Sequence, residues 1–175
     1  MNRPALSVVV PCYNEAACLD ILHARITGAA RAAVGDDYEI VMVNDGSKDD
    51  SWPAMQRLAA ADPRLVAINL SRNHGHQLAL TAGLDLCAGA QILIIDADLQ
   101  DPPELLAEMR ATMAAQDADV VYAVRRKREG ETVFKKIMGE KYDVKQFHEV
   151  LRDGAVPLTI LERLVEERAR AAVKA

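Results

Sequence analysis

The chain has 175 residues, a length that indicates one domain with room for a small appendage. Hydrophobic residues make up 50% of the chain but aromatic residues only 4%, so an aliphatic core is expected. The net charge of −5 makes general nucleic-acid binding a poor expectation, because phosphate contacts need clustered Lys and Arg.

The three cysteines, Cys12, Cys18 and Cys87, form no C-x-x-C pair, so reduced thiols are expected rather than a metal site or a disulfide framework. No basic-then-apolar signal segment opens the chain. No apolar run approaches the roughly 20 residues that a membrane-spanning helix needs. The chain by itself is therefore expected to be soluble.

Short β-branched runs alternate with segments of helical periodicity over most of the chain. Strands are predicted at residues 6–10, 38–43, 65–70, 91–95 and 118–124. Helices are predicted at residues 15–33, 50–61 and 77–87, and a further one begins at residue 101, with Asp101 as N-cap and Glu104 completing a capping box. This alternation predicts an α/β fold: an open, mainly parallel sheet with helices on both faces.

The pattern changes near Phe134, and from Ile137 onward no strand signal is present. Asp143 can cap a helix that ends at residues 153–154, and Pro157 opens a last helix. The sequence therefore predicts two parts, residues 1–136 as the α/β part and residues 137–175 as a short all-α tail of different origin.

Polar residues cluster where the predicted strands end, and in open parallel sheets ligands bind outside the carboxyl ends of the strands. Asp96 and Asp98 lie two residues apart after a buried strand, so the period of two would aim both carboxylates at the same face. A hard divalent cation would explain why two repelling carboxylates are held together, and Gln100 could add a carbonyl oxygen if the chain stays extended. Such an ion would neutralise a diphosphate so that a nucleoside diphosphate can leave. A solvated turn with a helix cap is the alternative.

Two further groups at strand ends are candidates for ligand contact. Asn14 and Glu15 would present polar groups to a base or a ribose, although Asn14 can also cap the following helix. Asp45, Gly46 and Ser47 combine a carboxylate with a glycine that lets the backbone approach a ligand, and a plain β-turn is the alternative.

The loop at residues 71–76 runs into a predicted helix N-terminus, which favours anions, and Arg72 adds a positive charge. His74 and His76 are interpreted as surface histidines, because no third His or Cys lies near them in the sequence. The basic cluster at residues 125–128 has two interpretations: contact with a diphosphate or an anionic lipid surface, or an ordinary solvated loop.

These ordered motifs together resemble family 2 glycosyltransferases of the GT-A, Rossmann-like fold. The likeness is carried by residues 8–15, 43–47, 71–77 and 96–104, and residues 122–136 continue it. Within that family the chain is similar to bacterial polyprenyl-phosphate glycosyltransferases, relatives of dolichol-phosphate mannose synthase. The resemblance covers about residues 6–136 and implies that this part is the nucleotide-sugar-binding part of a glycosyltransferase domain.

The resemblance also implies roles for single residues. Nucleotide contacts are implied for residues at the strand ends: Pro11, Tyr13, Asn14, Glu15, Asp45, Ser47, Arg72, Asn73, Gly75, Asp96 and Ala97. Asp96, Asp98 and Gln100 would surround Mg²⁺ or Mn²⁺, with Asp96 and Asp98 as the catalytic residues. The implied reaction moves a sugar from a UDP- or GDP-sugar to a polyprenyl phosphate with inversion. The acceptor is already anionic, so it needs less help from a general base than a hydroxyl would. The expected location is cytoplasmic, including a peripheral position at the inner face of the membrane.

After Lys136 the chain departs from the family pattern, because no acceptor-binding half and no amphipathic or membrane-spanning helices are recognisable. Residues 138–162 instead resemble the extreme C-terminal helices of a bacterial family of zinc-peptidase-like proteins. The His-Glu-x-x-His motif of that family is absent, so no peptidase activity is implied. Two functional hypotheses follow: a truncated transferase, and a nucleotide-sugar-binding remnant without turnover. A phosphoacceptor domain and a nucleotidyltransferase are disfavoured, because the acidic pair or the Gly-rich basic loop that they need after the first strand is missing.

Overall fold

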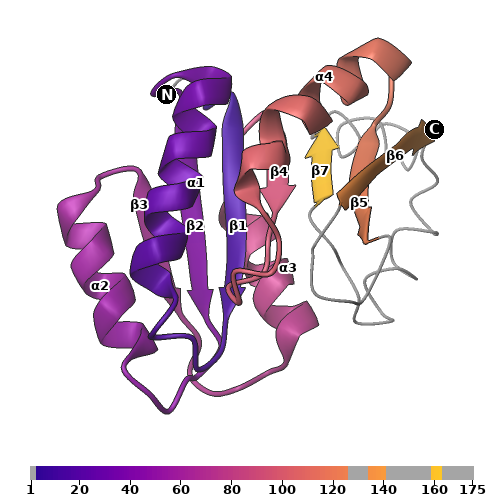
Figure 1. The fold of residues 1–175 in the computed structure, drawn as a ribbon. Coiled ribbons are helices and arrows are strands. Elements are labelled where there is room, and N and C mark those ends of the chain that lie inside the picture. The colour runs from indigo at the N-terminus through magenta and orange to yellow at the C-terminus, as the bar shows by residue number, and fades with distance from the viewer. Residues whose placement is uncertain (1–2, 126–133, 141–158, 163–175) are drawn as a thin grey trace, which may run out of the picture.

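The computed structural model describes residues 3–125, 134–140 and 159–162, and it is an α/β structure built on one sheet (Figure 1). The strands are β1 (Leu6–Cys12), β2 (Tyr38–Asn44), β3 (Leu65–Asn69), β4 (Gln91–Ile94), β5 (Val120–Arg125), β6 (Phe134–Glu140) and β7 (Thr159–Glu162). The helices are α1 (Leu19–Val34), α2 (Ser51–Ala61), α3 (His76–Leu86), the short 3-10 helix η1 (Pro103–Leu105) and α4 (Leu106–Gln116).

The sheet has the strand order β3-β2-β1-β4-β7-β5-β6. Strands β1 to β4 pair in parallel, whereas β7 is antiparallel to both β4 and β5, and β6 is antiparallel to β5. The predicted open and mainly parallel sheet is confirmed.

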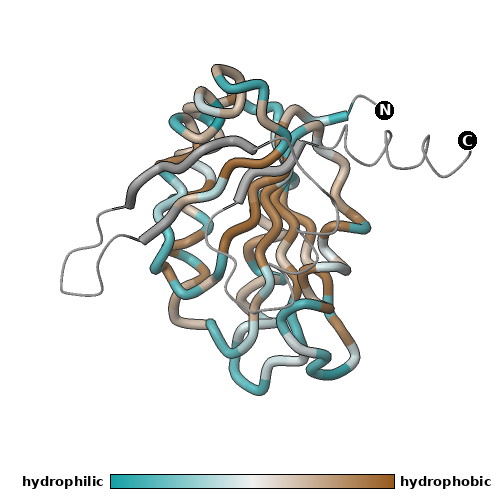
Figure 2. Tube along the Cα trace, turned by 90° about the vertical axis from the view of Figure 1, so that its right-hand side faces the viewer, coloured by the Kyte–Doolittle hydropathy of each residue, from teal (hydrophilic) through white to brown (hydrophobic). Residues whose placement is uncertain are grey.

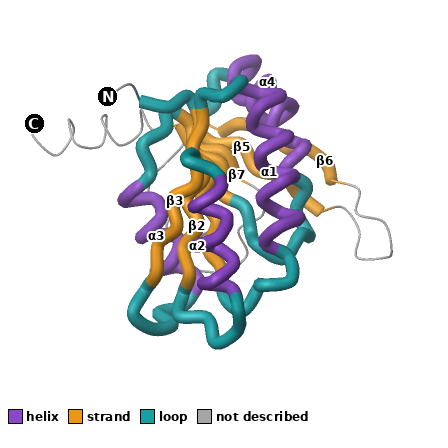
Figure 3. The backbone as a smooth tube through the Cα atoms, turned by 90° about the vertical axis from the view of Figure 1, so that its left-hand side faces the viewer, coloured by secondary structure: helices purple, strands orange, loops and turns teal. Residues whose placement is uncertain are grey.

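Helices cover both faces of the sheet, as the alternation of strands and helices predicts. Strand β1 shows why, because Val8 and Val10 belong to a core that includes residues of α1, α2 and α4, while Val9 belongs to a second core under α3. All three valines have no exposed surface. Because β1 is buried on both faces, its sequence is a continuous apolar run rather than an alternating one. Figure 2 shows the hydrophobic strands side by side, and Figure 3 shows the sheet between α3 and the pair α1 and α4.

The all-helical tail predicted for residues 137–175 is wrong where the structure describes it, because β6 and β7 are strands. Strand β7 lies between β4 and β5 and pairs with both of them. Without it, β4 and β5 would each present a row of unpaired backbone N–H and C=O groups. The predicted helix that Asp143 would cap, and residues 126–128 of the basic cluster, lie outside the described residues.

The capping box predicted for Asp101 and Glu104 is also wrong. The first turn is η1, and its N-cap is Pro102 rather than Asp101. Pro102 is extended, with φ −79° and ψ 114°, because the residue before a proline is pushed out of the helical region. None of the helices that the structure describes has the length and the apolarity that crossing a bilayer requires.

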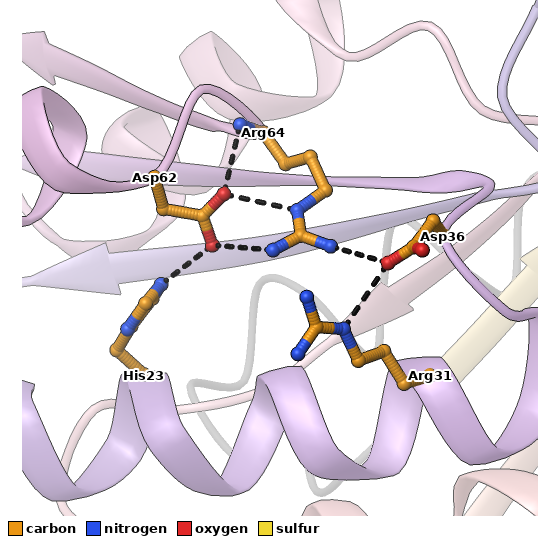
Figure 4. Close-up of polar contacts among 5 residues, drawn as sticks. All are labelled: His23, Arg31, Asp36, Asp62 and Arg64. Atoms are coloured by element: carbon orange, nitrogen blue, oxygen red, sulfur yellow. Dashed lines mark hydrogen bonds and ion pairs between the residues drawn. The ribbon is translucent and has the colours of Figure 1, made fainter.

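A buried carboxylate at the end of α2 ties three elements together (Figure 4). Asp62 accepts hydrogen bonds from the backbone N–H of Arg64 at 3.1 Å and from Arg64 Nε at 2.9 Å. His23 Nε2 of α1 lies 3.1 Å from the second oxygen of Asp62. Arg64 also donates to Asp36 at 2.6 Å, and Arg31 shares the same oxygen at 3.1 Å. The network joins α1 to the segments that lead into β2 and β3.

Asp62→Asn is expected to lower the free energy of unfolding at pH 7 by about 2 kcal/mol, because it leaves buried donors without a charged acceptor. Burial raises the pKa of Asp62, but the hydrogen bonds from Arg64 outweigh it, and the pKa lies below its ordinary value of 3.8. Because the pKa of Asp62 is lower in the folded state, the ionised carboxylate stabilises the fold fully at pH values above the pKa of Asp in the unfolded chain. This stabilisation is lost as the pH falls further. Denaturant unfolding should therefore show a difference between variant and wild type that shrinks below pH 3.8.

Asp20→Asn is the matched control, because Asp20 pairs with Arg57 at the surface and both side chains are 60% exposed. It should leave the melting temperature unchanged. An equal loss of stability in both variants would contradict the role given to Asp62.

Candidate functional site

The loops after β1 and β2 are joined by hydrogen bonds into one surface at the carboxyl ends of these strands. The backbone N–H of Asn14 donates to Ser47 Oγ at 2.9 Å, and Asn14 Oδ1 accepts from the backbone N–H of Lys48 at 2.8 Å. The backbone N–H of Glu15 donates to Ser51 Oγ at 2.9 Å. Asn14 has φ +58°, a left-handed conformation that Asn tolerates better than most residues. The loop is therefore fixed, and α1 begins at Leu19 rather than near the predicted position 15.

Asp49 is a site residue that the sequence analysis missed. Its Oδ2 accepts from the backbone N–H of Ala16 at 3.1 Å, and its Oδ1 accepts from the backbone N–H and the hydroxyl of Ser51 at 3.0 and 2.5 Å. Burial raises the pKa of Asp49, but the hydrogen bonds from Ser51 and Ala16 outweigh it, and the pKa is lowered. An Asp two residues before a Ser in a turn is a local signal for such bonds, whereas the contact with Ala16 cannot be read from spacing.

Asp45 holds the loop that leads into α3. Its side chain is buried, with 2% of the residue exposed, and its two oxygens accept from the backbone N–H groups of His74 at 2.7 Å and Gly75 at 2.9 Å. Gly46 has φ +63°, and a Cβ added to it would collide with the backbone carbon of Arg72 and the backbone nitrogen of Asn73. Only glycine permits this close approach, so Asp45 and Gly46 together fix the position of residues 72–75.

Asp96 and Asp98 follow β4 and are both partly exposed, while Ala97 between them is 3% exposed. Ala97 belongs to the core between the two partly exposed aspartates, although the Oδ1 atom of Asp96 is itself buried. That both carboxylates point to the same face stays a prediction. The condition for a ligand role of Gln100, that the chain stays extended, is not met, because Leu99 has φ +62° and the chain turns there. Gln100 is exposed, and its backbone N–H donates to Asp98 Oδ1 at 2.9 Å. A role of Gln100 as a metal ligand stays a prediction, and the extended backbone that it requires is not present.

Negative charge accumulates where the ends of β1 and β4 meet. Burial and the charges of Asp98 and Asp49 raise the pKa of Glu15. Burial and the charges of Glu15 and Asp96 likewise raise the pKa of the Cys12 thiol. The carboxylates of Asp96 and Asp98 therefore act on the same small region, at the end of β1 and the start of the following loop.

A divalent cation fits this donor set, because it prefers oxygen ligands and would relieve the repulsion. Within the described part of the chain, no three or more His, Cys, Asp or Glu side chains form a group that could hold a metal ion. An ion held by Asp96 and Asp98 would thus take its other ligands from a bound diphosphate or water.

His76 was interpreted as a surface histidine, and the structure places it beside the acidic pair. Its Nε2 lies 3.7 Å from Asp96 Oδ1, an ion-pair distance when the imidazole is protonated. His74 is exposed, and its contact with Asp45 is made by its backbone alone. No spacing in the sequence reveals the contact with Asp96, because it depends on where α3 starts relative to β4.

The remaining predicted nucleotide contacts differ in exposure. Pro11 is buried within β1 and pairs with Val43, so its side chain is not open to a ligand. Tyr13, Arg72 and Asn73 are exposed on the surrounding loops. The structure thus gathers the predicted residues at one edge of the sheet, and each nucleotide contact stays a prediction.

Residues 7–158 match the family model described as Glycosyl transferase family 2. The chain is 48% identical over 130 residues to the uncharacterized glycosyltransferase YkcC of Bacillus subtilis (strain 168), an overlap of 74% of this chain and 40% of that protein. It is 43% identical over 125 residues to the undecaprenyl-phosphate 4-deoxy-4-formamido-L-arabinose transferase of Pseudomonas syringae pv. syringae (strain B728a), covering 71% of this chain and 36% of that one. The chain thus spans well under half the length of these curated relatives.

The fold is similar to that of two solved structures. The mannosyltransferase PcManGT from Pyrobaculum calidifontis, solved in complex with GDP-Man and Mn²⁺, has a TM-score of 0.68 and 24% identity, with 97% of this chain and 47% of that chain covered. Residues 1–349 of S. aureus TarS, solved in complex with UDP-GlcNAc, give a TM-score of 0.59 and 23% identity, with 73% of this chain and 36% of that chain covered. These likenesses support the fold.

Asp45→Asn is expected to loosen the loop before α3, because an amide offers one acceptor oxygen where the carboxylate offers two. One of the N–H groups of His74 and Gly75 then loses its partner, and its amide hydrogen should exchange about tenfold faster, a change that corresponds to roughly 1.4 kcal/mol. NMR-detected hydrogen exchange measures this directly. Asp50→Asn is the control, because Asp50 is exposed at the N-cap of α2 and makes no side-chain capping bond. Equal exchange rates at His74 and Gly75 in the two variants would contradict the role of Asp45.

Proposed function

The chain belongs to glycosyl transferase family 2, and on that premise we propose that it forms the donor-binding part of a metal-dependent sugar transferase. The donor is a UDP- or GDP-sugar, the acceptor is a polyprenyl phosphate, and the reaction inverts the anomeric centre. The observation that carries this proposal is the position of Asp96 and Asp98, partly exposed after β4 beside the acidic region at the end of β1.

The loops after β1, β2 and β3 would form the nucleotide site. Hydrogen bonds from Asn14 to Ser47 and from Ala16 to Asp49 keep the first two loops in one arrangement, and Asp45 does the same for the third. A preorganised site binds more tightly, because less conformational entropy is lost on binding. Tyr13 is 41% exposed on this surface and offers an aromatic face to a base.

Asp96 and Asp98 would hold the cation, Mg²⁺ or Mn²⁺. When bound, such an ion supplies positive charge that stabilises the departing nucleoside diphosphate. The protein's own contribution is to present the two carboxylates on the same short loop after β4. PcManGT was solved with both GDP-Man and Mn²⁺, which supports this choice of ligands for a similar fold.

The acceptor is inferred from relatives whose names specify undecaprenyl phosphate. A phosphate oxygen attacks as an anion, so the site needs less general-base assistance than a hydroxyl acceptor would require. A lipid-linked acceptor would place the reaction at a membrane surface, with the donor-binding part in the cytoplasm.

A second candidate is a nucleotide-sugar-binding protein without turnover. This chain spans 40% or less of the length of the relatives described above. Incubation of the chain with a nucleotide sugar, Mn²⁺ and undecaprenyl phosphate separates the two candidates. We expect little or no transfer by this chain alone, and efficient transfer would exclude the second candidate.

A thermal-shift panel tests donor binding. UDP- or GDP-sugars should raise the melting temperature only when Mn²⁺ or Mg²⁺ is present. The rise should be about 5 °C or more at a ligand concentration near 100 times Kd. Asp98→Ala should abolish it, while Asp85→Ala, which removes an exposed carboxylate from α3, should preserve it. A panel without any shift, or a shift that survives Asp98→Ala, would refute the proposed metal and nucleotide site.

A further inference from the structure

We propose that His76 is a positioning residue that orients the Asp96 carboxylate for a bound cation. The inference rests on the proposed function and deepens it. The imidazole Nε2 lies 3.7 Å from Asp96 Oδ1, and the two side chains are 38% and 36% exposed. Although both side chains are partly exposed, Asp96 Oδ1 itself is buried, and a small shift of either side chain would bring an N–H group into hydrogen-bonding range of this oxygen.

The backbone fixes His76 from its N-terminal side. His76 is the first residue of α3, and its N-cap Gly75 has φ +92°, a conformation that favours glycine. Asp45 accepts from the backbone N–H groups of His74 and Gly75, so the residues just before His76 are tied to the end of β2. The starting point of α3 is thus set by a buried carboxylate.

The helix itself is seated firmly on the sheet. Ala79 and Leu80, on the face of α3 that packs on the sheet, are buried. A Cβ added to Gly83 of the same helix would come within 2.5 Å of Val9 Cγ1. With both its start and its body held, α3 carries His76 at a fixed place relative to β1 and its neighbour β4. The loop after β4 then brings Asp96 to it.

The surrounding charge explains why a donor is useful at this place. Glu15 and Asp96 both lie close enough to raise the pKa of the Cys12 thiol, and Asp98 raises the pKa of Glu15, so the Asp96 carboxylate lies in an acidic region. A nearby N–H donor favours one orientation of the Asp96 carboxylate over rotation away from this group. Carboxylates that ligate metals are commonly held in this way by a second residue, and loss of that residue weakens metal binding by about 10- to 100-fold.

Mn²⁺ binding measured by electron paramagnetic resonance, with saturating UDP and GDP in parallel, tests the role of His76. His76→Ala should raise the Kd for Mn²⁺ by about 10-fold, whereas His76→Gln, which keeps an N–H donor, should stay within about threefold of the wild type. His74→Ala is the control, because it removes an exposed imidazole from the same loop and keeps the backbone bond to Asp45. Because His76 is at the surface, the melting temperatures should not change. If His76→Ala does not fold, His76→Leu replaces it, since leucine keeps the bulk without the donor.

The role of His76 is overturned if His76→Ala binds Mn²⁺ as well as His74→Ala does. It is also overturned if His76→Gln loses as much affinity as His76→Ala, because the donor would then not be what matters. If the wild-type protein binds no Mn²⁺ with either nucleotide, the proposed function itself fails and this inference fails with it. The wild-type measurement therefore separates the two failures.

Discussion

Repulsion between carboxylates at the ends of β1 and β4 is the constraint on which the rest of the site depends. Asp96 and Asp98 lie on the loop after β4, and Glu15 lies on the loop after β1, where burial and the charge of Asp98 raise its pKa. Parallel pairing of β1 with β4 brings these loops together, so the repulsion follows directly from the strand order. Groups held together at such a cost are typical of functional sites, because a bound cation or ligand offsets the repulsion.

The rest of the structure resists that repulsion. The valines of β1 pack into the cores on both faces of the sheet and hold this strand in place. The hydrogen bonds from Asn14 to Ser47 and from Ala16 to Asp49 hold the loop that carries Glu15. Asp45 and Gly46 do the same for the start of α3. A network at Asp62 joins α1 to the segments before β2 and β3. The acidic residues are thus presented by a scaffold whose own hydrogen bonds do not depend on a ligand.

The sequence predicts the fold well where a local pattern decides the structure. Strands β1, β2 and β4 are mostly buried, continuous apolar runs, and β1 to β5 all lie close to their predicted bounds. The strands of the tail were missed, because β7 is stabilised by β4 and β5, which are distant in the sequence. Asp96 and Asp98 were found from their spacing after a strand. The contacts of Asp49 and His76 were not found, because they depend on which loops the sheet order brings together.

The most direct test of the acidic pair is a crystal structure of the protein grown with Mn²⁺ and UDP or GDP, with anomalous diffraction used to locate the metal. We predict an anomalous peak bonded to carboxylate oxygens of Asp96 and Asp98 and to the diphosphate of the nucleotide. A Mn²⁺ peak elsewhere, or a nucleotide bound with its diphosphate away from these two residues, would contradict the assignment.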